Sequence, residues 1–157
     1  GNVHEKSYIE FLNLPIEEIK ELSIKQLKDN MPVYIGINIM KYRDIKSGVL
    51  DTRLYNYKET FRFDLLNKEE ALNTNDIYSH HCMTICGVNL LEDGKSQRWK
   101  IEDSYGDEKK FNGYYIMNDN YFNEFLLQAV INKKYLSKEQ LEMLNQDAIE
   151  FEINDPF

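Results

Sequence analysis

The first forty residues show a helical pattern followed directly by a strand pattern. Between Leu14 and Asn30, apolar side chains recur at the spacing of one helix face, behind a proline that is tolerated in a first helical turn. Acidic residues open this segment and lysines close it, as the helix dipole favours. From Val33 to Ile39, apolar residues occupy every second position. The pattern therefore predicts a helix that leads into a strand with one buried face.

The stretch from Tyr42 to Tyr57 has no clear period. Polar and aromatic residues are mixed there around a turn at Ser47-Gly48. Further on, Asn67 stands where an N-cap residue would open a short helix that ends near Leu72. We therefore expect mostly loops and short elements between the first strand and residue 72.

The second half of the chain is a run of strands with short helices between them. The pair Asp93-Gly94 separates two apolar runs, which is a strong signal for a β-hairpin. The sequence therefore predicts an α+β fold, an antiparallel sheet with an N-terminal helix and short peripheral helices. The expected elements are strands at 80–91, 97–103, 113–117 and 128–134, a helix at 120–126, a helix opened by Ser137 with Gln140 at the capping-box position, and an extended tail at 149–157.

Length and charge narrow the possible partners. A chain of 157 residues is long enough for one domain with an ordinary core. A net charge of −8, with lysines and arginines scattered, disfavours binding to nucleic acid or to anionic membranes. No apolar stretch reaches the roughly 20 residues of a membrane span. The chain begins with Gly rather than Met, so we expect a single domain excised from a larger protein.

Two cysteines, Cys82 and Cys86, lie four residues apart in a predicted strand. Their Cα atoms would be about 13 Å apart at the rise of a strand, which is too far for a disulfide. Free thiols indicate a reducing compartment, so we expect a cytoplasmic protein. Both cysteines are expected to pack in the core as small apolar residues.

The histidines His80 and His81 are the most chemically suggestive residues. On a strand they point to opposite faces, so they do not act together easily. A metal site built from His80, Cys82 and Cys86 would extend over too many strand positions to hold one tetrahedral ion. We therefore expect no metal and no other cofactor.

His81 alone could equally be a hairpin histidine that is satisfied by a backbone carbonyl. The predicted hairpin, however, returns the end of its second strand, with Asp103, to the start of the first. A carboxylate beside an imidazole fixes its tautomer and its orientation. The pair therefore suggests a general base with its orienting group.

Two strings of residues resemble one known family. Residues 79–85, SHHCMTI, resemble the T-H-A-M-T-F pattern around the catalytic histidine of papain-like cysteine peptidases of the bleomycin hydrolase and aminopeptidase C family. Aligning Met83-Thr84 places that histidine on His81 and not on His80. Residues 99–107, WKIEDSYGD, resemble W-x-V-E-N-S-W-G-E, with the orienting asparagine at Asp103. Shorter matches near residues 14–17, 67–70, 113–114, 118–119 and 155–156 extend the resemblance over nearly the whole chain.

The resemblance implies the C-terminal, histidine-bearing half of such a peptidase, folded as a half-barrel. His81 would be the general base and acid, Asp103 its orienter, and His80 and Tyr105 would contact the substrate. The substrate would be a peptide, the missing N-terminal half would be a partner, and the intact enzyme would form homo-hexamers in the cytoplasm.

This chain departs from the family in four respects. The family nucleophile lies on a helix of the N-terminal half, so neither Cys82 nor Cys86 takes its role. Asp103 replaces a neutral amide by an anion, which favours the imidazolium and weakens His81 as a base. Tyr105 replaces a shielding tryptophan, and the chain ends soon after Asp155-Pro156. An active peptidase and a degenerate member that serves binding or assembly therefore both remain open.

Overall fold

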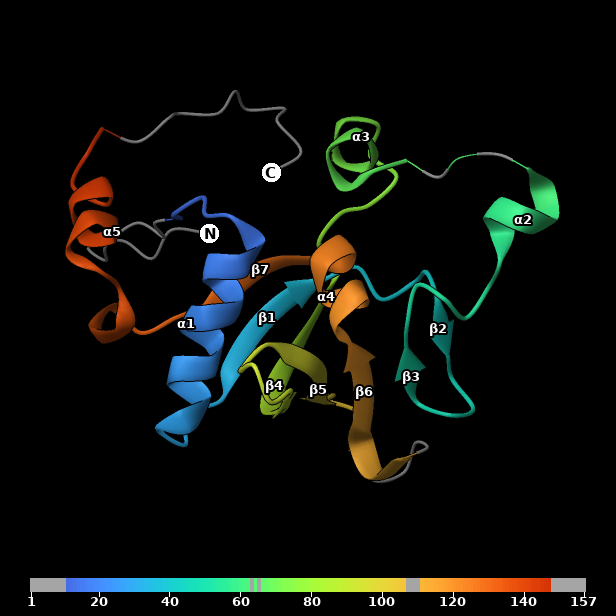
Figure 1. Ribbon diagram of the computed structural model, residues 1–157, viewed down its shortest axis with the longest axis horizontal. Helices are drawn as coiled ribbons and strands as arrows, with labels where there is room; N and C mark the ends of the chain where they lie inside the picture. Colours follow the sequence, from blue (N-terminus) through green and yellow to red (C-terminus); the bar gives the residue numbers. More distant parts are fainter. Residues whose placement is uncertain (1–10, 63, 65, 107–110, 148–157) are drawn as a thin grey trace.

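A computed structural model describes residues 11–62, 64, 66–106 and 111–147, and its main feature is one sheet edged by short helices (Figure 1). The N-terminal helix and all but one of the strands predicted after residue 79 lie within one or two residues of the predicted bounds. The helices are α1 (Ile16–Lys28), α2 (Tyr57–Phe61), α3 (Lys68–Asn73), α4 (Asp119–Phe125) and α5 (Lys138–Met143), with 3₁₀ turns η1 (Phe111–Gly113) and η2 (Lys133–Tyr135). The strands are β1 (Val33–Ile37), β2 (Arg43–Asp44), β3 (Val49–Leu50), β4 (His81–Leu90), β5 (Ser96–Glu102), β6 (Tyr114–Asn118) and β7 (Leu126–Val130).

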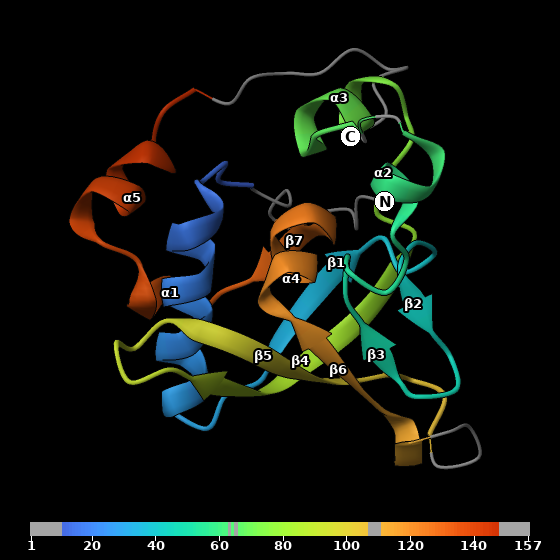
Figure 2. The same ribbon diagram turned by 45° about the vertical axis from the view of Figure 1, so that its right-hand side comes forward.

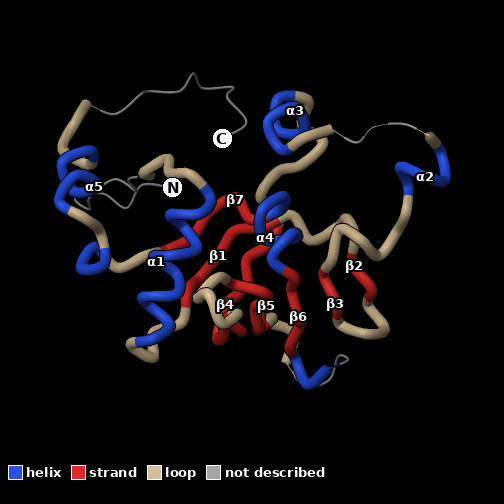
Figure 3. The backbone as a smooth tube through the Cα atoms, in the orientation of Figure 1, coloured by secondary structure: helices blue, strands red, loops and turns tan. Residues whose placement is uncertain are grey.

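The seven strands form one curled half-barrel sheet in the order β2-β3-β6-β5-β4-β1-β7 (Figure 3). Every neighbouring pair is antiparallel except β3 and β6, which run parallel. The predicted α+β class with an antiparallel sheet is confirmed, apart from this one pair. The short strands β2 and β3 arise in the region where the sequence predicted only short elements, because two-residue strands leave no readable period.

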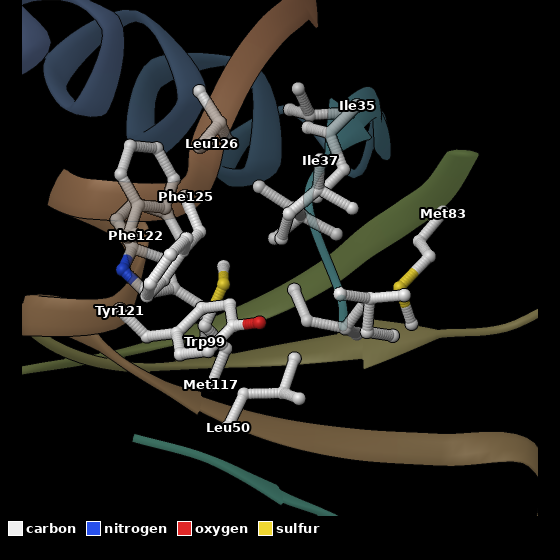
Figure 4. Packing of buried hydrophobic residues seen from close by; sticks show 14 of the residues in the cluster. Ile35, Ile37, Leu50, Met83, Trp99, Met117, Tyr121, Phe122, Phe125 and Leu126 are labelled. Atoms are coloured by element: carbon white, nitrogen blue, oxygen red, sulfur yellow. The ribbon is translucent and has the colours of Figure 1, made fainter. Parts of the chain in front are cut away.

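The core lies on one face of the sheet, where α1 and α4 also pack (Figure 2). Trp99 of β5 stacks on Phe122 of α4 with ring centroids 4.6 Å apart (Figure 4). Tyr121 and Phe125 of the same helix contact each other at 4.6 Å. The strands contribute buried side chains that alternate along each strand, as expected for a half-buried sheet. They are Val33, Ile35, Ile37, Leu50, Met83, Ile85, Ile101 and Met117.

A buried ion pair joins α1 to the rest of the core. The ammonium of Lys20, almost fully buried, donates to Asp119 Oδ2 at 2.7 Å and to Glu17 Oε1 at 3.0 Å. The other oxygen of Asp119 accepts from Trp99 Nε1 at 3.1 Å and from the Ser96 hydroxyl. The Lys20 ammonium and both carboxylate oxygens of Asp119 have partners, which is the condition under which a buried ion pair is tolerated. The pair therefore fixes where α1 and α4 meet β5.

The two cysteines do not pack in the core, so that prediction is wrong. Both thiols are free and both residues are exposed. The described elements cover one face of the sheet, and Met83 and Ile85 of β4 lie on it. Cys82 therefore points to the other face, and Cys86 lies at a register shift between Ile85 and Gly87.

Helix starts follow the sequence closely, whereas one strand is displaced. Asn67 and Ser137 both form the capping boxes that their sequences suggest. The strand predicted at 128–134 runs instead from Leu126 to Val130, and η2 follows it. The backbone becomes extended directly at the end of α4, and Asn132 accepts from the Lys134 N–H and so turns the chain into η2. The predicted tail at 149–157 lies outside the described residues.

Asp51, just after β3, holds that edge of the sheet against α4. Its carboxylate accepts hydrogen bonds from the side-chain amides of Asn118 and Asn120 and from the guanidinium and N–H of Arg53. Burial alone would raise the pKa of Asp51, but these hydrogen bonds outweigh it and hold the pKa well below its ordinary value. The ionised carboxylate therefore stabilises the folded state.

We expect Asp51→Asn to lower the free energy of unfolding by about 1–3 kcal/mol at pH 7. The NH₂ group of the new amide would then lie against N–H donors that the carboxylate now accepts from. Since the folded pKa lies below the unfolded one, this stabilisation is present above about pH 4 and is lost as the pH falls below that value. Urea unfolding of both proteins at pH 7 and near pH 3 measures it. The difference in unfolding free energy between wild type and Asp51→Asn should shrink at the lower pH. Asp147→Asn, at an exposed position, is the control and should unfold like wild type at both pH values.

Candidate active site

His81 and Asp103 come together because β4 and β5 are antiparallel neighbours. His81 is the first residue of β4, and it pairs with Ile37 of the neighbouring strand β1. Thr84 pairs with Glu102, the last residue of β5, so Asp103 follows directly where β4 begins. The N–H of Asp103 donates to the Gly113 carbonyl at 2.9 Å, which fixes its backbone. The hairpin predicted from Asp93-Gly94 is therefore what assembles the pair.

The two side chains form a hydrogen bond that determines the histidine tautomer. His81 Nε2 lies 3.1 Å from Asp103 Oδ1, and the Asp103 side chain is only 3% exposed. The same oxygen accepts from the Ser104 N–H at 2.7 Å. An ionised carboxylate can only accept, so Nε2 carries the proton that it donates. The second ring nitrogen, Nδ1, is then left for a reacting group.

Tyr105 covers one face of the imidazole. Its ring lies nearly parallel to that of His81, with an interplanar angle of 12° and centroids 6.0 Å apart. Tyr105 itself is 56% exposed, so water reaches its outer side. The residue is thus placed to shield the His81–Asp103 bond in part. A role in binding substrate stays a prediction.

His80 lies apart from this pair. It is exposed, its Nδ1 is 3.4 Å from the Tyr78 carbonyl, and its ring contacts that of Tyr78 edge-on at 5.5 Å. It is not among the residues that line the cavity at His81. The structure therefore brings His81, Asp103 and Tyr105 together and leaves His80 outside; its predicted contact with substrate stays a prediction.

An open cavity of about 450 Å³ lies beside the pair. Sequence reasoning missed the other lining residues, because they are brought together by strand register: Tyr34 pairs with Thr84, which pairs with Glu102. A hydrogen bond with the Cys82 thiol, and then burial, raises the pKa of Tyr34. Besides His81 and Asp103, the lining residues are Tyr34, Cys82, Met83, Thr84, Glu102 and Ser104.

The cavity lies where β4 begins, and residues of both sides of the sheet line it: His81 and Met83 from the core side, and Tyr34, Cys82 and Thr84 from the outer face, which is not covered by any described element. Direct strand partners form one row across five strands: Val130, Tyr34, Thr84, Glu102 and Tyr114. Val130 and Tyr34 are 61% and 52% exposed. Val130 and Tyr34 thus expose neighbouring apolar and aromatic side chains at one end of a row that also carries the polar Thr84 and Glu102. This outer face therefore has the character of a contact surface.

Gly36 allows the segment before His81 to pass close to β1. A Cβ at this position would lie 2.5 Å from Ser79 Oγ and 3.0 Å from Gln128 Oε1. Ser79 is two residues before His81, and Gly36 pairs with Cys82 directly after it. The absence of a side chain at Gly36 thus contributes to the placement of the histidine.

The chemistry of the cysteines and of possible metal ligands gives no further catalytic group. Partial burial raises the pKa of the Cys86 thiol, which donates to the Lys100 carbonyl at 3.4 Å, so it is not an activated thiolate. Among residues 11–62, 64, 66–106 and 111–147, no three histidine, cysteine or acidic side chains are grouped to hold a metal ion. In the same part of the chain, no helix has the length and apolarity to span a membrane.

Comparison with known proteins identifies the class. The sequence model of the Peptidase C1-like family matches residues 1–157. Aminopeptidase G of Lactobacillus delbrueckii subsp. lactis is 39% identical over 150 residues, which is 95% of this chain and 34% of that protein. Aminopeptidase C of Listeria monocytogenes is 34% identical over 157 residues, 99% of this chain and 35% of the relative.

A solved structure is also similar in fold. The crystal structure of PepW from Lactobacillus rhamnosis HN001 superposes with a TM-score of 0.81 at 36% identity, covering 85% of this chain and 30% of that one. The chain therefore belongs to the peptidase C1-like family, and the predicted papain-like, aminopeptidase C type resemblance is confirmed. It spans about a third of the length of these relatives.

The geometry of the pair predicts the tautomer of His81. We expect neutral His81 to carry its proton on Nε2, because Asp103 accepts there, and we expect Asp103→Ala to give a mixture of both tautomers. Ring nitrogen chemical shifts from ¹⁵N NMR distinguish the two forms. His80 in the same protein is the internal control and should be unchanged. A wild-type His81 protonated on Nδ1 would contradict the assignment.

Proposed function

We propose that this chain is the histidine-bearing part of a papain-like cysteine aminopeptidase, in which His81 is the general base and acid and Asp103 orients it. The observation that carries the proposal is the hydrogen bond of 3.1 Å between His81 Nε2 and Asp103 Oδ1 at the wall of an open cavity. Family membership supports a peptide as the substrate. The nucleophilic cysteine belongs to the part of the protein outside this sequence.

The arrangement suits acyl transfer through a thioester. With Nε2 held by Asp103, Nδ1 takes the proton of the nucleophilic thiol and forms a thiolate–imidazolium pair. The thiolate attacks the scissile carbonyl, a C–S bond forms, the C–N bond breaks, and His81 gives its proton to the leaving amine. Water then gives a proton to His81 and breaks the C–S bond, which releases the carboxylic acid. Asp103 remains ionised throughout and stabilises the imidazolium.

The outer face of the sheet is the proposed docking surface for the missing half. It carries the exposed Tyr34 and Val130 beside the cavity, and the chain spans only about a third of its relatives. A nucleophile delivered into the cavity at the start of β4 would meet Nδ1 of His81. Assembly of the complete protein into a homo-oligomer, a hexamer by resemblance, and a cytoplasmic location, which suits the free thiols, belong to the same proposal.

A degenerate member that serves binding or assembly is the second candidate. Two observations favour it: a carboxylate stands at Asp103 where the family has an amide, and Tyr105 leaves the pair more open to water. The complete gene separates the two candidates. A cysteine at the nucleophile position, preceded by the glutamine of the oxyanion hole, favours the enzyme, whereas serine, glycine or alanine there favours the binding protein.

Activity of the complete protein tests the proposal directly. We expect it to release amine from a fluorogenic aminoacyl substrate, and we expect His81→Ala to reduce kcat by about 10²–10⁴-fold, because the proton transfers lose their carrier. Asp103→Asn, which restores the family's neutral acceptor, should retain activity, whereas Asp103→Ala should lose most of it.

The controls separate chemistry from binding. His80→Ala should change KM at most, since His80 lies outside the cavity. Residues 1–157 alone should show no turnover. Full activity of His81→Ala in the complete protein would refute the role given to His81, and turnover by the isolated chain would refute the need for an external nucleophile.

A further inference from the structure

Strand β7 is one of the two edges of the sheet, and it differs from the other edge. Its partner on the inner side is β1, and no strand of the described residues pairs with its other side. The opposite edge, β2, has only two residues, Arg43 and Asp44, both with charged side chains. Short and charged edges resist the addition of another strand. Residues 126–130, LLQAV, are longer and uncharged, so β7 lacks both of these protections.

Lys68 of α3 occupies one end of this edge. Its ammonium donates to the Leu126 carbonyl at 2.6 Å and to the Asn123 carbonyl, in α4, at 3.0 Å. Burial lowers the pKa of Lys68 to about 8, and the negative charge of Glu124 offsets only part of this effect. The side chain is thus held against the edge strand rather than in water.

Gln26 of α1 occupies the other end. It is 3% exposed, and its Nε2 donates to the Val130 carbonyl at 3.3 Å and to the Pro32 carbonyl at 2.8 Å. Its Oε1 accepts from the Asn132 N–H at 2.9 Å. All three polar contacts are to backbone groups at the end of β7 or at the start of β1.

A strand that added to β7 would need the same backbone groups. Antiparallel pairing uses the outward carbonyls and N–H groups of the edge strand. The carbonyls of Leu126 and Val130, at its two ends, already accept from Lys68 and Gln26. An incoming strand would have to displace a buried amide and a desolvated ammonium, and each would lose one of its backbone acceptors.

We propose that Lys68 and Gln26 close the β7 edge, and that the strand they exclude is β7 of a second copy of this chain. Two copies of one edge strand pair antiparallel about a twofold axis, so the surface is complementary to itself. The five residues carry no charge, so two copies of the strand do not repel each other locally. Val130, 61% exposed, would gain apolar contacts in such a pair. The proposal does not depend on the proposed function.

Association of the chain measures the effect. We expect Lys68→Met, and more strongly Lys68→Met with Gln26→Leu, to shift the chain toward dimers by at least tenfold in dissociation constant relative to wild type, in light scattering coupled to size exclusion. Lys68→Arg keeps a donor and should behave as wild type. Lys25→Met makes the same change of charge on an exposed position of α1 and is the matched control.

A further substitution shows whether the edge is responsible. Val130→Lys puts a charge on β7 and should abolish any dimer that Lys68→Met forms. Circular dichroism establishes whether each variant is folded. If the double variant does not fold, the result for the single variant Lys68→Met tests the proposal. A folded Lys68→Met chain that associates no more than Lys25→Met, or a dimer that persists with Val130→Lys, would overturn the proposal.

Discussion

The antiparallel pairing of β4 with β5 is the interaction on which the candidate site depends. It places the start of one strand beside the end of the other, and so sets His81 next to Asp103 although 22 residues separate them. The strands on either side, β1 and β6, hold this pair within the sheet. On one side β1 allows a close approach at Gly36, and on the other β6 continues the sheet toward Asp51.

Buried charge is used in this protein to fix the geometry of the fold. Lys20 and Asp119 join α1 to α4, and Asp103 holds His81. In each case the carboxylate or ammonium is nearly inaccessible to water, so its partner cannot be exchanged for solvent without a large cost. The same physics explains why the buried carboxylate of Asp103 can hold the imidazole in one orientation.

The two faces of the sheet have different chemistry. The inner face is closed by α1, α4 and a continuous core, whereas the outer face carries exposed aromatic and apolar residues beside the cavity. The β7 edge of the sheet is covered as well, by the side chains of Gln26 from α1 and Lys68 from α3. A nucleophile supplied from outside this chain would therefore have to reach His81 through the open cavity where β4 begins.

The sequence by itself predicted α1, the capped helices α3 and α5, and the hairpin, because these depend on local periods, caps and a turn, whereas the choice of His81 and Asp103 came from the resemblance to a family. Only the tertiary structure decided that Cys82 and Cys86 face outward, that Tyr34 and Glu102 line the cavity, and that Lys68 reaches β7. An apolar stretch of sequence around the cysteines is compatible with a strand that is buried on one face or on both. Which face is buried depends on the elements that pack against it. Partners far apart in the chain are chosen by strand register and packing, which no local pattern encodes.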